Sequence, residues 1–141
     1  MDCFIDRRKL SSIMDVFASQ SNFLSWKGAS EEEISSAECE LNLSFSEDYR
    51  EYLSVFGIAA FDGHEITGLT NSRRLNVVSV TLEARQRYPE LSEEFYVMEE
   101  TGVEEYIVLQ KTDGAVYGCA PNYRLEKKYN SLCEYFTCNM S

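Results

Sequence analysis

Apolar residues recur at helical spacing through the first third of the chain. The first predicted helix has one apolar face at positions i, i+3, i+4 and i+7, formed by Leu10, Ile13, Met14 and Phe17. A second helix is predicted to begin at about Glu31, because Ser30 and Glu33 have the spacing of a capping box. Its apolar face consists of Ile34, Ala37 and Leu41. Between these helices lies a lone tryptophan, Trp26, which we expect to be a core anchor.

Three more helices are predicted from their capping residues. Ser46, followed by two acids, is typical of a helix N-terminus, and Gly57 is placed to end that helix. Asn76 caps the next helix, which must end before Pro89. Ser131 begins a closing helix, since Glu134 completes the spacing of a capping box. The apolar faces of the three helices are, in order, Tyr49, Tyr52, Leu53 and Phe56; Val77, Val80, Thr81, Ala84 and Tyr88; and Leu132, Tyr135 and Phe136.

Alternation of apolar and polar residues predicts strands in the second half. An Asp62-Gly63 turn is followed by an alternating segment at 65–69, and an Asp113-Gly114 turn is a strong hairpin signal. The remaining strands are expected from Phe95 to Met98, from Glu104 to Gln110 and from Ala115 to Cys119. The predicted fold class is therefore α+β, with helices packed around one side of a central, mainly antiparallel sheet.

Length and composition favour a single domain over residues 1–141. The chain has 141 residues, 44% of them hydrophobic, and contains no internal repeat or Pro-rich or Gly-rich linker. No apolar run has the length of a signal-peptide core or a membrane span, so we expect a cytoplasmic protein without membrane contact. Five scattered cysteines make a poor disulfide framework and are expected to be free thiols.

The chain is strongly acidic, with a formal net charge of −11 from 24 acidic and 13 basic residues. This charge repels nucleic-acid phosphate and attracts a basic partner, although acidity also serves solubility alone. The clustering of the acidic residues along the sequence favours the interpretation that they bind a basic partner. Between Glu90 and Glu105 there are seven acids and no Lys or Arg: Glu90, Glu93, Glu94, Glu99, Glu100, Glu104 and Glu105.

The sequence offers little catalytic chemistry. Its one histidine, His64, follows the Asp62-Gly63 turn, where a polar ring at a hairpin tip is the ordinary interpretation. The cysteines lack metal-ligand spacing, and no phosphate-binding loop is present. Adjacent acids such as Glu99-Glu100 point to opposite faces of a strand, which leaves one carboxylate per face. We therefore expect no enzyme, no cofactor and no metal site.

The order of these elements resembles the SUKH superfamily, whose best-known members are cell-wall assembly regulators of fungi and bacterial immunity proteins. The resemblance rests on the segment from Ile34 to Leu41, the Asp48-Tyr49-Arg50-Glu51-Tyr52-Leu53 motif and Gly57, and it extends to Trp26, Glu65-Ile66-Thr67-Gly68 and the stretch from Phe95 to Phe136. Two positions depart from the pattern. Asn42 stands where the family commonly has Gly, and Phe45-Ser46 where it has Leu-Pro, but Ser46 retains the capping chemistry.

The resemblance implies a non-catalytic binding protein. Our hypothesis is an immunity protein that neutralises a cognate toxin with a basic, nuclease-like domain, delivered by a competing bacterial cell in contact-dependent inhibition. The alternative is a regulatory or scaffold protein of the cell-wall assembly regulator type. We expect a monomer or weak homodimer. The candidate partner-binding residues combine acids with aromatic anchors: Glu93, Glu94, Tyr96, Glu99, Glu100, Glu104, Glu105 and Tyr106.

Overall fold

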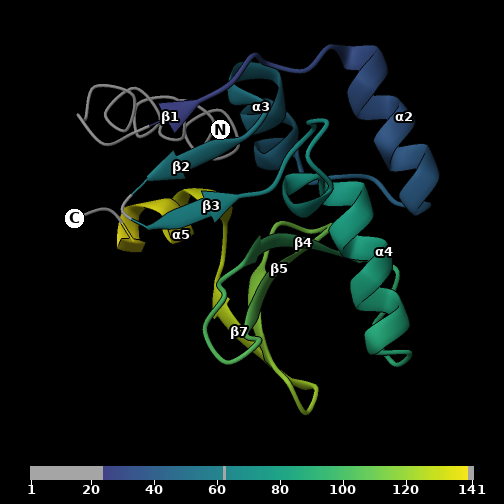
Figure 1. The fold of residues 1–141 in the computed structure, drawn as a ribbon, viewed down its shortest axis with the longest axis vertical. Coiled ribbons are helices and arrows are strands. Elements are labelled where there is room, and N and C mark those ends of the chain that lie inside the picture. The colour runs from purple at the N-terminus through teal and green to yellow at the C-terminus, as the bar shows by residue number, and fades with distance from the viewer. Residues whose placement is uncertain (1–23, 62, 140–141) are drawn as a thin grey trace.

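A computed structural model describes residues 24–61 and 63–139. The helices of this part are α2 (Glu31–Leu41), α3 (Glu47–Phe56), the short 3₁₀ helix η1 (Arg73–Leu75), α4 (Val77–Arg87) and α5 (Leu132–Asn139) (Figure 1). One antiparallel sheet consists of β1 (Leu24–Ser25), β2 (Ala59–Phe61) and β3 (His64–Ile66). A second consists of β4 (Phe95–Glu100), β5 (Ile107–Lys111), β6 (Val116–Ala120) and β7 (Arg124–Tyr129). The helix predicted from Leu10 to Phe17 lies outside the described residues.

Local capping explains where three of the helices begin. Ser30 and Glu33 form the predicted capping box, with the Ser30 amide 2.8 Å from Glu33 Oε1. The hydroxyl of Ser46 accepts from the Tyr49 amide at α3, and Asn76 Oδ1 accepts from two amides at the start of α4. At the end of α3, Gly57 has φ 73°, a conformation that costs least for glycine. These sequence predictions are confirmed.

The strands follow the predicted hairpins. Phe61 pairs with His64 across the two-residue connection between β2 and β3, and Gly114 has φ 100° in the turn before β6. Strands β4 to β7 form a meander in which every neighbour is antiparallel. We did not predict β7, because its sequence is charged and most of its side chains are exposed, as suits the edge of a sheet.

Apolar side chains cover both faces of the four-stranded sheet. Phe95, Val97 and Leu109 belong to one cluster, which α4 completes with Val80 and Ala84. The alternate residues Tyr96 and Met98 belong to a second cluster, with side chains from α2, α3 and α5. The α+β class with antiparallel sheets is confirmed. The arrangement differs in one respect from our expectation, since helices lie against both faces and not around one side (Figure 1).

The described helices are also short, and none is long and apolar enough to cross a membrane. Cys39, Cys119 and Cys138 are free thiols, which agrees with the scattered spacing of the cysteines. Cys3 lies outside the described residues.

Three tyrosines form the centre of the larger core. Tyr49, Tyr52 and Tyr96 are fully buried, and their rings lie side by side, with centroids 5.0 Å apart for Tyr49 and Tyr96. Each hydroxyl has a protein acceptor. Tyr49 and Tyr52 donate to the carbonyl of Thr67 at 3.1 and 3.0 Å, and Tyr96 donates to Gln110 Oε1 at 2.6 Å. Burial raises the pKa of all three phenols well above its ordinary value.

These raised pKa values predict a loss of stability at alkaline pH. Below pH about 10, the ordinary pKa of tyrosine, the phenols are neutral in the folded and unfolded states, so their contribution is constant. Above it, only the unfolded chain releases their protons, and the free energy of unfolding falls as pH rises. Tyrosinate absorbance should therefore show that these three tyrosines ionise only as the protein unfolds. A single transition of all tyrosines, without unfolding, would contradict this.

Candidate partner-binding site

The predicted acidic run does not form one patch. Strand β4 separates it into two groups, because six extended residues span about 20 Å. Glu90, Glu93 and Glu94 precede the strand, whereas Glu104 and Glu105 follow it in the connection to β5. These acids lie close together in the sequence, but they do not form one continuous acidic surface.

The group before β4 has basic neighbours. Lys111 Nζ lies 3.8 Å from Glu94 Oε1, so a cation from β5 offsets part of the charge. Glu93 Oε1 accepts from Asn42 Nδ2 at 3.3 Å, and Arg85 donates to the Glu93 carbonyl at 3.1 Å. A basic partner would have to compete with these groups. This end of β4 is therefore a less favourable contact for a basic partner than the end that carries Glu104 and Glu105.

Two of the candidate residues, Tyr96 and Glu99, are buried and do not present their side chains to a partner. Tyr96 is 0% exposed and belongs to the tyrosine core, while Glu99 is 3% exposed. A β-bulge between Val97 and Glu99 shifts the register of β4 against β5. The extra residue changes the alternation, so Glu99 turns toward α5 and β3. We therefore remove both residues from the candidate contact surface.

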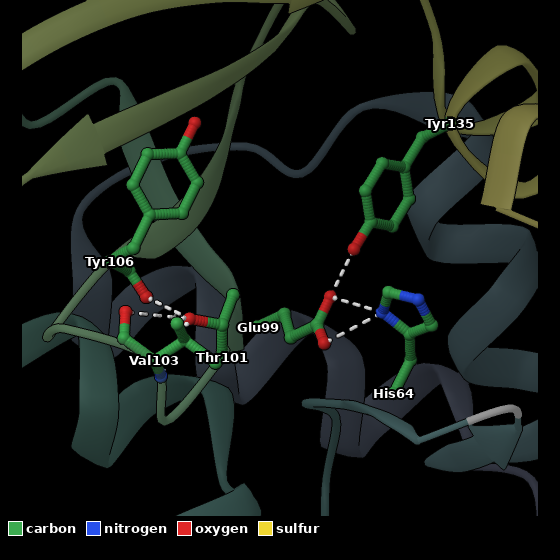
Figure 2. Close-up of polar contacts among 6 residues, drawn as sticks. All are labelled: His64, Glu99, Thr101, Val103, Tyr106 and Tyr135. Carbon is green, nitrogen blue, oxygen red and sulfur yellow. Dashed lines mark hydrogen bonds and ion pairs between the residues drawn. The ribbon is translucent and has the colours of Figure 1, made fainter.

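Glu99 instead joins three elements of the fold. Its Oε2 lies 2.9 Å from Nδ1 of His64 on β3, and its Oε1 accepts from the Tyr135 hydroxyl on α5 (Figure 2). Since a carboxylate only accepts hydrogen bonds, His64 Nδ1 is the donor. Burial raises the pKa of Tyr135, and the adjacent Glu99 charge raises it further. The sequence suggested only a polar ring for His64, because no local pattern shows its long-range partner.

The connection from β4 to β5, residues 101–106, is a closed turn that we call the acidic loop. The Thr101 hydroxyl donates to the Tyr106 carbonyl at 2.8 Å (Figure 2), and it accepts from the Val103 amide at 3.2 Å. The Tyr106 amide donates to the Val103 carbonyl at 3.0 Å. Glu104 and Glu105 have φ of 53° and 59°, a left-handed conformation that costs about 1 kcal/mol or more per residue. The backbone contacts hold this strained turn in one shape.

The tip of the acidic loop combines one apolar side chain with two charges. Val103 is 65% exposed, and the neighbouring Glu104 and Glu105 are exposed as well. Tyr106 is half-buried, with its ring packed so closely over Gly118 that a Cβ there would lie 1.7 Å from the phenol oxygen. Tyr106 therefore serves to anchor the loop on β6, and its flanking acids remain available to a partner.

Glu100 extends the negative surface from the end of β4. It is partly buried, and its pKa is raised by burial and by the charge of Glu83 on α4, against the opposing effect of Arg87 and Arg74. Of the eight candidate residues, the structure thus brings Glu100, Glu104, Glu105 and Tyr106 together at one end of β4. Within the described residues, no group of three or more His, Cys, Asp or Glu could hold a metal ion.

Comparison with known proteins identifies the family. The family model SUKH_5, described as SMI1-KNR4 cell-wall, matches residues 9–138, which is nearly the whole chain. A search of curated proteins gave no match. The superfamily includes immunity proteins and cell-wall proteins, and its members are generally non-catalytic. The matched range contains the capped helices, the tyrosine core and the acidic loop described above, and the chain belongs to the SUKH superfamily.

Proposed function

We propose that this protein is an immunity protein that binds a toxin protein and blocks it through the acidic loop. The observation that carries the proposal is an exposed, conformationally fixed acidic turn on a member of a superfamily that includes immunity proteins. The formal net charge of −11 supports the same conclusion, because it favours a basic partner.

A nuclease domain is the toxin class that fits this surface best. Its active site must be basic to hold phosphate, so an acidic protein is attracted to it and can occupy it in place of nucleic acid. The hydrogen bonds of Thr101 hold the loop in shape before binding, which lowers the entropic cost of association. Val103 supplies an exposed apolar contact next to the ion pairs that Glu104 and Glu105 would form with the partner.

Charge reversal at the loop tests the proposal. We expect Glu104→Lys combined with Glu105→Lys to lower the association rate with the cognate toxin by about tenfold or more. Lysine tolerates the same backbone conformation as glutamate, and exposed charges contribute little to stability, so the melting temperature should change little. The measurement is stopped-flow binding to a toxin encoded beside this chain, together with protection of cells that co-express both proteins.

The matched control applies the same charge change at the other end of β4. Glu90→Lys with Glu94→Lys should slow association by less than about threefold, since long-range attraction alone is reduced. Equal effects of the two double variants would show that the loop is not the contact. Failure of the unmodified chain to protect cells from, or to bind, any neighbouring toxin at micromolar concentration would end the immunity proposal itself.

The family description, which names the cell wall, favours a second candidate function. In that case the protein would be a regulatory scaffold that tethers other proteins without inhibiting them. Binding of a partner whose activity is unchanged in the complex would favour the scaffold over the immunity protein.

A further inference from the structure

A groove lies apart from the acidic loop, between α2 and the segment from Leu69 to Ser79. Its volume is about 730 Å³, within the range of sites that hold a ligand or a few side chains. No residue of the acidic loop lines it. An inference about this groove therefore does not depend on the proposed toxin contact.

Trp26 stands at the groove with its ring half exposed. We expected a core anchor, but 50% of the residue is accessible, and this expectation is wrong. Its amide is held by the carbonyls of Phe56 and Ile58, at 3.1 and 3.3 Å, after the short β1 strand. The backbone is thus fixed while the ring remains available, as is common for tryptophans that anchor a partner.

The groove has an apolar floor and charged rims. Ala37 is buried in the floor, and Leu69 and Val78 are half-buried beside it. Glu32 and Glu40 are exposed on the α2 side, and neither forms an ion pair with another described residue. The apolar floor would accept a hydrophobic side chain, and the two carboxylates have no ion-pair partner in the part of the chain that the structure describes.

The charge of the α2 wall indicates which kind of occupant fits. Segment 31–51 contains eight acids, which are Glu31, Glu32, Glu33, Glu38, Glu40, Glu47, Asp48 and Glu51. Its one base, Arg50, is already paired with Glu31 and with Glu38. The two cations of the groove, Lys27 and Arg73, belong to other segments, Arg73 to η1 across from the helix. Along α2, Arg50 therefore offsets the charge near Glu31 and Glu38, whereas Glu32 and Glu40 have no ion pair with a described residue.

We propose that this groove binds a short protein segment in which a large apolar side chain is flanked by Lys or Arg. The apolar side chain would lie on Leu69 and Val78 against the ring of Trp26. The flanking cations would pair with Glu32 and Glu40. Such a segment supplies both charge complementarity and apolar burial, which neither an acidic segment nor a purely polar basic segment does.

Trp26 provides a direct readout, because it is the only tryptophan of the chain. The probe is a synthetic peptide of alternating Lys and Leu, compared with a Lys/Ser peptide and a Glu/Leu peptide of the same length. We expect the Lys/Leu peptide to shift the Trp26 emission to shorter wavelength and to bind at least about tenfold more tightly than the other two. Equal binding of the Lys/Ser peptide, or no spectral change with any peptide, would overturn the proposal.

Two variants locate the binding. Glu32→Lys with Glu40→Lys should weaken binding by about tenfold or more in calorimetry, and Ser36→Phe, which fills the groove from an exposed position, should do the same. Glu104→Lys with Glu105→Lys is the control with the same charge change. If this control weakens binding as much as the groove variants, binding follows net charge alone and the proposal fails. If dilution of the chain without peptide shifts the emission, the occupant is a second copy, and the proposal fails in that case too.

Discussion

Replacing His64 with alanine should lower the free energy of unfolding by about 2 kcal/mol, because it removes one of the two hydrogen-bond donors of the buried Glu99 side chain and leaves only Tyr135. The Glu99 side chain is 4% exposed and that of His64 is 28% exposed, which places the contact largely inside the protein. His64 lies on β3, Glu99 on β4 and Tyr135 on α5. The substitution therefore removes a hydrogen bond at the place where the two sheets meet the last helix. Urea unfolding followed by circular dichroism measures the change.

The control for this prediction is an exposed ion pair. Arg74 and Glu65 have side chains that are 63% and 48% exposed, and Arg74→Ala should lower the free energy of unfolding much less than His64→Ala, because exposed ion pairs contribute little. Adding Glu99→Gln to His64→Ala should recover part of the loss, because the amide keeps an acceptor for Tyr135 without a buried charge. The explanation fails if His64→Ala costs no more than Arg74→Ala.

Gly68→Ala should be at least as damaging, with a loss of about 3 kcal/mol or failure to fold. A Cβ at Gly68 would lie 1.6 Å from the carbonyl oxygen of Gly57 and 2.8 Å from the Ile58 side chain. The Gly57 carbonyl also accepts from the Leu69 amide, and the Gly68 carbonyl accepts from the Val77 amide, so neither backbone segment can move without breaking bonds. Overpacking against backbone is relieved less easily than against a side chain.

Gly102→Ala is the matched control for that substitution. Gly102 has φ 73° and no atom within 4 Å of an added Cβ. Alanine there should therefore lower the free energy of unfolding only by the cost of a left-handed backbone conformation, about 1 kcal/mol. Thermal unfolding should therefore show a much larger shift for Gly68→Ala. Equal shifts would mean that the segments around Gly57 and Gly68 adapt more readily than this packing indicates.

Signals within a few residues predicted the described helices well. Ser30, Ser46 and Asn76 satisfy backbone donors two or three positions away, and Gly57 ends a helix through its own backbone freedom. Hairpin turns are equally local, which is why the β2–β3 and β5–β6 connections agreed with the sequence. The strand β7 escaped prediction because its stability comes from pairing with β6 and not from an apolar pattern of its own.

The candidate site depended more on distant contacts. Glu99 is buried because a bulge in β4 turns it toward His64 and Tyr135, which lie 35 and 36 positions away. Trp26 is exposed and lines a groove between α2 and the segment from Leu69 to Ser79, an arrangement of distant segments that the local sequence does not specify.

The sequence by itself determined the acidity, the α+β class, the helix ends and the family resemblance. Charge follows directly from composition, and helix ends depend on hydrogen bonds between residues only a few positions apart. Tertiary structure alone decided which acids share a surface and where Trp26 lies. Those properties follow from strand length, a one-residue bulge and the packing of segments far apart in the chain.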